Sequence, residues 1–304
     1  GFLKWMKEIW KKLNSSHPDI VLGSEFGIST IIIILHKFVT RRHYKIVIIN
    51  DDSYDMLVNN NPFTKRHARA VKAMMPLVDD VINVEPRVAA YNQQKYQKGI
   101  YFPIICNDVI AKKRLERVLP ISQNYVSKYQ LEGKKVLLFV GRLVVLKNVK
   151  FALRAFIKAN LDNTIFVIVG DGPEKEKLEK IAAGNPAVIF TGRLEGDELY
   201  AWYNVGQVFT LPSYKEPFGA VTNEALVAGC KVLISKDAGS NCLVKDGKNG
   251  FIIDSRHEMN FIEKLKLAFY SMKPLKMPLE VKGNMMISSF EENIKKLYSC
   301  ISNS

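Results

Sequence analysis

The sequence predicts an α/β protein made of two Rossmann-like domains, each built on a doubly wound parallel sheet. The sequence has short apolar runs at 45–49, 135–140 and 164–169, and the continuous β-branched residues of the first run are typical of a parallel strand that is covered on both faces. Helix-length segments alternate with these runs along the chain, which is the doubly wound pattern. A chain of 304 residues, 47% of them hydrophobic, is long enough for two such domains.

The first domain is expected over residues 1–125. Its strands are predicted at 19–23, 45–49, 81–84 and 100–102, with helices at 2–13, 28–41, 65–76 and 88–94. The segment 104–132 is basic and has no strong period, so we expect the linker between the domains there.

The helix at 2–13 is amphipathic, and two interpretations of it stay open. One face gathers the apolar side chains Phe2, Met6, Ile9, Trp10 and Leu13, while four lysines lie elsewhere. Such a helix can lie on a membrane surface, or it can pack on the strand that follows it.

The second domain is expected over residues 131–280. Strands are predicted at 135–140, 164–169, 188–190, 207–211 and 231–234, with a last short strand after Asn249 and Gly250. Helices are predicted at 148–159, 198–204, 220–228 and 261–270, and a closing helix at 290–298.

The segment 209–229, FTLPSYKEPFGAVTNEALVAG, shows the clearest pattern for binding chemistry. A short strand is followed by a turn and then by a predicted helix whose start presents the backbone N–H groups of residues 219–221. Because helix starts attract anions, this geometry suits a diphosphate. Two carboxylates flank the segment. Glu224 in the helix can accept two hydroxyls of a ribose, and Glu216 in the loop can reach a group beyond the far phosphate.

A second phosphate-binding pattern begins the second domain. The strand 135–140 runs into Gly141 and Arg142, and Lys147 follows just before a helix. Arg142 offers a fork of donors and Lys147 offers a point charge, both suited to a diphosphate. The next strand ends at Gly170, where the lack of a side chain lets the backbone pass close to a nucleotide.

These residues together resemble the retaining glycosyltransferases of family GT4, the glycosyl transferases group 1. The resemblance rests on Glu216 and Glu224 with seven residues between them, on Pro-Phe-Gly after the first glutamate, and on the pattern Gly141-Arg142-Leu143 with Lys147-Asn148. It is strong over about 135–255 and covers the first domain only in outline. It implies the GT-B fold, in which two Rossmann-like domains face a cleft and residues 281–304 pack back on the first domain.

The resemblance also implies roles for individual residues. Arg142 and Lys147 would hold the donor diphosphate, and Glu216 would position the sugar, so these three are the candidate catalytic residues. Glu224 would hold the ribose, and Arg193 and Leu194 would contact the base. The remaining residues expected at the donor are those at the two phosphate-binding loops: Gly141, Gly170, Phe218, Gly219, Ala220 and Val221.

The first domain departs from the family pattern in two places. Nothing in residues 1–20 resembles the strand and glycine-rich turn with which these proteins usually begin, so we expect this domain to be incomplete. The strand end where many relatives carry a histidine holds Asn50 and Asp51 instead. These two are candidates for the acceptor side, with a plain polar loop as the alternative. The GT-B fold needs no metal, so no metal site is expected.

Composition narrows the choice of partners. The net charge is +14, and residues 1–130 hold 20 Lys and Arg against 11 Asp and Glu, a surplus of nine. A basic surface favours an anionic partner, and we expect an anionic membrane surface rather than nucleic acid, for which no fold signature is present. The longest apolar run is far shorter than a membrane span, and four scattered cysteines indicate a reducing compartment. A cytoplasmic location is expected, with peripheral attachment at the inner face of the membrane.

The sequence therefore predicts the transfer of a sugar from a nucleotide-sugar donor to a saccharide or a lipid-linked saccharide, with retention at the anomeric carbon. A UDP-sugar is the expected donor and a GDP-sugar the next, with no obligatory cofactor. The alternative is a GT-B protein that binds the nucleotide-sugar without catalysing transfer.

Overall fold

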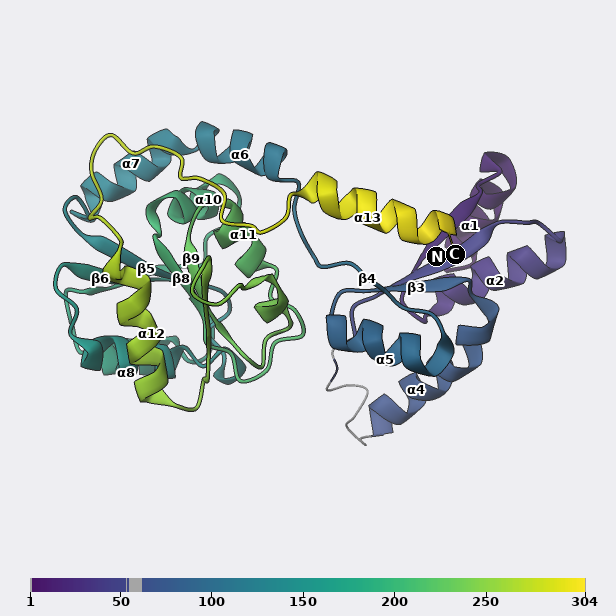
Figure 1. The fold of residues 1–304 in the computed structure, drawn as a ribbon, viewed down its shortest axis with the longest axis horizontal. Coiled ribbons are helices and arrows are strands. Elements are labelled where there is room, and N and C mark those ends of the chain that lie inside the picture. The colour runs from purple at the N-terminus through teal and green to yellow at the C-terminus, as the bar shows by residue number, and fades with distance from the viewer. Residues whose placement is uncertain (1, 53, 55–61, 304) are drawn as a thin grey trace. The chain divides into compact units, whose positions relative to one another are not determined.

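The computed structural model of the chain describes residues 2–52, 54 and 62–303, and it divides into two compact units (Figure 1). The first comprises Gly1–Pro103 and Glu292–Ser304, and the second comprises Ile104–Glu291. Each unit carries its own parallel sheet, so the predicted fold class is confirmed.

The sheet of the first unit has four parallel strands in the order β1-β2-β3-β4. They are β1 (Ile20–Ser24), β2 (Lys45–Asn50), β3 (Asp80–Asn83) and β4 (Ile100–Tyr101). The strands lie within one or two residues of their predicted positions.

Helices flank this sheet. They are α1 (Phe2–Ser16), α2 (Ile28–Thr40), α4 (Pro62–Met74) with the short η1 (Met75–Leu77), α5 (Pro86–Tyr96) and α13 (Phe290–Asn303). In α1, Ile9 and Leu13 pack into the core beside β2, and Trp10 lies edge-on to His36 of α2, with ring centroids 4.8 Å apart. The apolar face of α1 thus packs within the domain. In α13, Leu297 and Ile301 pack on the core around Val47 of β2.

The second unit holds a sheet of six parallel strands in the order β10-β9-β8-β5-β6-β7. The strands are β5 (Lys135–Val140), β6 (Thr164–Val169), β7 (Val188–Gly192), β8 (Val208–Leu211), β9 (Lys231–Ser235) and β10 (Gly250–Ile253). Strand β5 lies between β8 and β6, so the loops that follow these three strands emerge side by side at one edge.

The remaining helices belong to the second unit. They are α6 (Asp108–Arg117), α7 (Leu119–Lys128), η2 (Val145–Lys147), α8 (Val149–Ala159), α9 (Lys175–Ala182), α10 (Gly196–Val205), α11 (Val221–Val227), η3 (Gly239–Leu243) and α12 (Glu258–Tyr270). Among the described residues, no helix is both long and apolar enough to cross a membrane.

The segment expected to be an irregular linker, 104–132, instead contains the helices α6 and α7. Asn107 caps α6 by accepting a hydrogen bond from the Ile110 N–H at 3.1 Å. Tyr125 of α7 stacks on Trp202 of α10, with centroids 4.7 Å apart, and Ser122 Oγ donates to the Ala201 carbonyl at 3.1 Å. Residues 104–125, which the sequence pattern places in the first domain, therefore belong to the second unit, because their apolar faces pack on α10.

Candidate functional site

The ends of β5 and β6 meet closely at the edge of the second sheet. A Cβ atom on Gly170 would lie 1.9 Å from the carbonyl oxygen of Gly141, so no side chain fits between the two loops. Backbone bonds join them: the Gly141 N–H donates to Val169 at 3.0 Å, and the Leu143 N–H donates to Asp171 at 2.8 Å. The result is a smooth backbone wall that a flat or phosphorylated ligand can approach.

This wall opens into a cavity of about 370 Å³ that five of the predicted donor residues line. They are Gly141, Arg142, Gly170, Arg193 and Leu194, with Val140, Val169, Asp171 and Glu195 completing the lining. Within the described part of the chain, the exposed guanidinium of Arg142 has no ion pair or hydrogen bond with the protein. Arg193 differs, because its Nε donates to Glu195 at 3.0 Å. Arg142 is thus the cation in this lining that is available to an anion.

Lys147 and Glu216 form an ion pair between Nζ and Oε2. Lys147 ends η2, and Glu216 lies in the loop after β8. The two loops are tied by the Tyr214 N–H, which donates to the Leu146 carbonyl at 2.9 Å. The Glu216 carbonyl in turn accepts from the Gly239 N–H at 3.0 Å. The structure therefore brings together two of the three candidate catalytic residues, in a loop arrangement held by backbone bonds.

The loop at 218–221 has the expected geometry before the helix. Gly219 has φ +93°, and a Cβ atom there would lie 2.6 Å from Leu211 Cδ2, so a side chain is excluded. Phe218 is buried, and its carbonyl accepts from the Ser240 N–H at 2.7 Å. Among the bonds of the described residues, none uses the N–H groups of Gly219, Ala220 or Val221 as donors. The helix itself is α11 (Val221–Val227), shorter at both ends than the predicted 220–228.

Glu224 is held by two tyrosines that the sequence did not indicate. Tyr203 Oη donates to Oε2 at 2.8 Å, and Tyr200 Oη lies 3.4 Å from Oε1. Burial and then the charge of Glu224 raise the pKa of Tyr200 to about 12 and that of Tyr203 well above its ordinary value. The same two causes raise the pKa of Cys106 to about 11. Glu224 thus lies among neutral donors. The i, i+3 spacing of the tyrosines in the sequence places both on one face of a helix, but it does not indicate that this face contacts Glu224.

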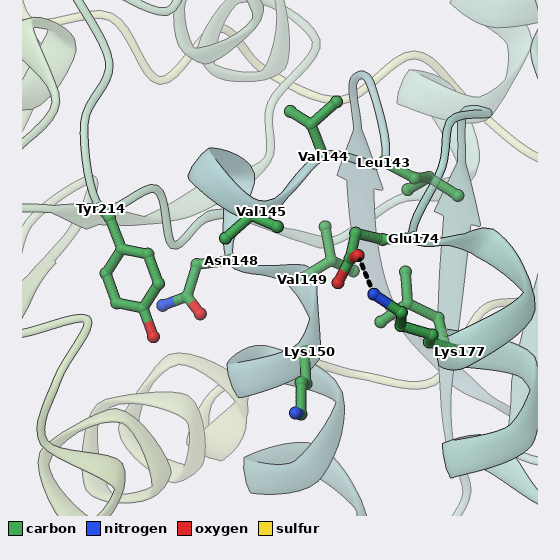
Figure 2. A pocket seen from close by; sticks show the side chains of 10 residues that line it. Leu143, Val144, Val145, Asn148, Val149, Lys150, Glu174, Lys177 and Tyr214 are labelled. Atoms are coloured by element: carbon green, nitrogen blue, oxygen red, sulfur yellow. Dashed lines mark hydrogen bonds and ion pairs between the residues drawn. The ribbon is translucent and has the colours of Figure 1, made fainter.

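A second cavity, of about 310 Å³, lies beside the loop that carries Lys147 (Figure 2). The aliphatic side chains of Leu143, Val144, Val145 and Val149 line one part of it, and the ring of Tyr214 is drawn next to Asn148 in the view. Lys177 pairs with Glu174 at 2.7 Å on another wall. None of the predicted site residues lines this cavity.

Two polar residues of the first unit were expected on the acceptor side, and they differ in exposure. Asn50 is buried, and its Nδ2 donates to Asn83 Oδ1 at 3.3 Å. Asp51 is exposed. The neighbouring Asp52 pairs through Oδ2 with His67 Nε2 at 2.7 Å, a contact that sequence reasoning missed because the partners are 15 residues apart. Of these positions, Asp51 offers a side chain to solvent.

The two parallel sheets define the fold class of the protein, since its structural neighbours among the solved structures are GT-B glycosyltransferases. The sequence profile of the glycosyl transferases group 1 matches residues 122–277, and the chain belongs to this family.

Two curated relatives and one solved structure illustrate the similarity. Sulfoquinovosyl transferase SQD2 of Arabidopsis thaliana is 36% identical over 44% of this chain and 26% of its own length. Alpha-monoglucosyldiacylglycerol synthase of Acholeplasma laidlawii is 29% identical over 58% of this chain and 52% of its own. The chain thus spans only part of these relatives. The fold of Anabaena HepE, solved in complex with UDP, matches 97% of this chain and 82% of that one, with a TM-score of 0.72 at 15% identity.

Proposed function

We propose that this protein transfers a sugar from a nucleotide-sugar donor to an acceptor hydroxyl with retention at the anomeric carbon. The observation that carries the proposal is the cavity beside Gly141 and Gly170, where the guanidinium of Arg142 has no protein partner among the described residues. A bare backbone wall and an available fork of donors suit a nucleoside diphosphate, whose phosphate oxygens a planar guanidinium can bind in pairs.

In this proposal the two cations act on the leaving group. The bond between the anomeric carbon and the diphosphate oxygen breaks, the acceptor oxygen bonds to the same carbon, and the acceptor proton and the nucleoside diphosphate are released. Arg142 and Lys147 stabilise the charge that grows on the diphosphate, normally the largest contribution to such a step. Since these side chains supply the positive charge, we propose no obligatory metal or other cofactor.

The two glutamates contact different parts of the nucleotide-sugar donor in this proposal. Glu216, paired with Lys147, positions the sugar through its hydroxyls and steadies positive charge at the anomeric centre. Glu224 accepts the ribose hydroxyls one turn inside α11. The backbone of Gly219–Val221 faces the diphosphate, and Arg193 and Leu194 contact the base.

The donor is tested by thermal shift with UDP, GDP and ADP and with their sugar conjugates. A ligand at ~100 times its dissociation constant stabilises the folded state by about 2.7 kcal/mol, which gives a clear shift. We expect a shift with UDP, or with GDP as the next choice, and its loss in Glu224→Ala. No shift with any nucleotide would contradict the proposal.

Catalysis is tested separately, because a protein that binds the donor without transfer is the alternative function. We expect release of nucleoside diphosphate from the bound donor in the presence of saccharide or lipid-linked saccharide acceptors. The anomeric configuration of the product, followed by proton NMR, reports retention or inversion. Donor binding without release of nucleoside diphosphate for any acceptor would favour the non-catalytic alternative.

An anionic membrane surface is the second partner we propose, with the protein attached peripherally on the cytoplasmic face. In α2 the side chains of Ile28, Ile31, Leu35, Phe38 and Val39 are exposed along one face. Exposed lysines of the neighbouring α1, at 4, 7, 11 and 12, supply the complementary charge. The alpha-monoglucosyldiacylglycerol synthase among the relatives bears a lipid product in its name, which supports a lipid-linked acceptor.

Sedimentation with vesicles of phosphatidylcholine, alone or mixed with phosphatidylglycerol, tests this attachment. Salt-sensitive binding is expected only with the anionic vesicles, and it should be weaker in a Leu35→Ser, Phe38→Ser variant. Equal recovery from both kinds of vesicle would contradict the proposal.

A further inference from the structure

We infer that Tyr203 and Tyr200 are positioning residues that orient the carboxylate of Glu224 so that its two remaining lone pairs accept the two hydroxyls of the donor ribose. This inference rests on the proposed function and adds to it the side chains that determine how the ribose is recognised. It starts from the contacts of Tyr203 Oη with Oε2 at 2.8 Å and of Tyr200 Oη with Oε1 at 3.4 Å.

Tyr203 is a fixed donor. Its side chain is 0% exposed, it stands in the last turn of α10, and its ring lies beside Phe209 of β8, with centroids 6.4 Å apart. A fully buried ring between a helix and a strand keeps one rotamer. Packing within the protein therefore lets Tyr203 fix the direction of Glu224 Oε2.

Tyr200 is held in place by a cation over its ring. The guanidinium of Arg114 lies over its ring, with Cζ 3.7 Å from the centroid, and Arg114 Nε donates to Asp197 at 3.1 Å. Asp197 also accepts from Arg117 Nη2 at 2.7 Å. A cation over the ring and an anchored guanidinium keep Tyr200 next to Glu224 Oε1. The helix α6, which lies in the segment predicted to be a linker, thus supports the donor site through Arg114.

The carboxylate of Glu224 can accept two further hydrogen bonds beside those from the two tyrosines. A carboxylate offers about four lone-pair positions, two on each oxygen. Among the hydrogen bonds of the described residues, one tyrosine occupies one position on each oxygen, which leaves one position on each oxygen open. Adjacent hydroxyls on a ribose present two donors at a matching separation, and each can donate to one oxygen. Both tyrosines are protonated at neutral pH, and burial and the charge of Glu224 raise their pKa values further above their ordinary value.

The consequence is measurable as ribose selectivity. Hydrogen bonds to a charged group are strong enough that losing one hydroxyl should weaken nucleotide binding by roughly 10-fold or more. If the tyrosines orient Glu224, removing the Tyr203 hydroxyl frees the carboxylate to turn. Tyr203→Phe should then reduce the preference for UDP over 2′-deoxy-UDP to less than about a third of the wild-type value.

Isothermal titration of the whole chain with UDP and 2′-deoxy-UDP, or with GDP and 2′-deoxy-GDP if GDP binds better, is the test. Tyr203→Phe removes one oxygen and keeps the buried ring, and Tyr200→Phe gives an independent variant at a half-buried position. Tyr125→Phe is the matched control. The ring of Tyr125 stacks on Trp202 of α10, the helix that carries Tyr200 and Tyr203, and Tyr125 makes no hydrogen bond to Glu224 among the described residues. In turnover with a donor sugar, we expect KM to rise in Tyr203→Phe with little change in kcat.

Each outcome has one meaning. Reduced ribose selectivity in both variants, with wild-type selectivity in Tyr125→Phe, supports the inference. Wild-type selectivity in Tyr203→Phe and Tyr200→Phe overturns it and leaves the proposed function standing. Wild-type protein that binds ribo- and deoxynucleotides equally also overturns it, because Glu224 then does not recognise the ribose. Failure of the wild type to bind any nucleotide overturns the proposed function itself.

Discussion

Lys147 and Glu216 pair with each other across 69 residues of sequence, with side chains that are only 18% and 13% exposed. Both are expected to contact the donor, one at the diphosphate and the other at the sugar. In the structure each neutralises the charge of the other. The binding of a nucleoside diphosphate must therefore draw Lys147 away from Glu216 or share it between two anions.

This competition predicts opposite effects on binding and on turnover. Glu216→Gln should raise the affinity for UDP by roughly 5-fold, because a partly buried pair of this kind is worth about 1 kcal/mol that the diphosphate no longer has to overcome. Turnover should fall in the same variant, since the sugar loses its carboxylate. Titration calorimetry and initial rates measure the two quantities. Glu174→Gln, which removes the partner of Lys177, is the control and should change neither.

Arg142→Ala should lower turnover by about 100-fold or more, the usual effect of removing one donor that stabilises developing negative charge. The side chain lines the cavity beside Gly141 and Gly170 and has no protein partner among the described residues, so its loss should leave stability unchanged. Initial rates at saturating donor check the effect. Arg154→Ala, at an exposed position on α8, is the control and should keep the wild-type rate. An unchanged rate in Arg142→Ala would remove Arg142 from the mechanism.

Gly170→Ala should both destabilise the second unit and impair nucleotide binding. The added methyl would lie 1.9 Å from the Gly141 carbonyl oxygen, so the two loops must separate, at a cost of about 1–3 kcal/mol or more. Urea unfolding followed by circular dichroism gives the stability, and thermal shift with UDP gives the binding. Gly283→Ala, where a Cβ atom meets nothing within 4 Å, should behave like the wild type. Full stability of Gly170→Ala would show that the loops are not packed as described.

The buried His36 should make the first unit less stable as pH falls below its ordinary pKa of 6.5. Burial, and then the charge of Arg42, lower the pKa of His36 in the folded state. Above pH 6.5 the ring is neutral in both states. Between 6.5 and the lowered value, the unfolded chain takes up a proton that the folded chain does not, so the free energy of unfolding decreases as pH falls.

Urea unfolding from about pH 7.5 to about pH 5.5 measures this dependence. In His36→Gln the free energy of unfolding should depend less on pH below 6.5. The variant should also be less stable at every pH, because it loses the hydrogen bonds of the ring to Tyr44 Oη and Asn14 Oδ1, at 3.0 and 3.1 Å. His43→Gln is the control at an exposed histidine and should keep the wild-type slope. Parallel curves for His36→Gln and the wild type would refute the assignment.

Sequence reasoning was sufficient wherever the information is local. The strands of both sheets follow from short apolar runs, and the loops after β5 and β6 follow from glycines directly at strand ends. The loop after β8 follows from the turn at Pro212 and Ser213 and from Glu216. Since parallel strands deliver their carboxyl ends to one edge, the shared cavity of Gly141, Arg142 and Gly170 follows from residue order and strand direction. The family followed from the spacing of Glu216, in the loop after β8, and Glu224, in α11, together with Pro-Phe-Gly and the pattern of Gly141-Arg142-Leu143 with Lys147-Asn148.

Pairings between distant segments were decided by the tertiary structure alone. The sequence determined which side chains stand at the sheet edge, because residue type and spacing act within a strand, a turn or a helix. It did not determine that Lys147 pairs with Glu216, that Tyr203 and Tyr200 hold Glu224, that Asn50 is buried against Asn83, or that α6 and α7 pack on α10. Those contacts depend on how faces of separate elements fit together, and many partners satisfy the same local pattern until packing selects one.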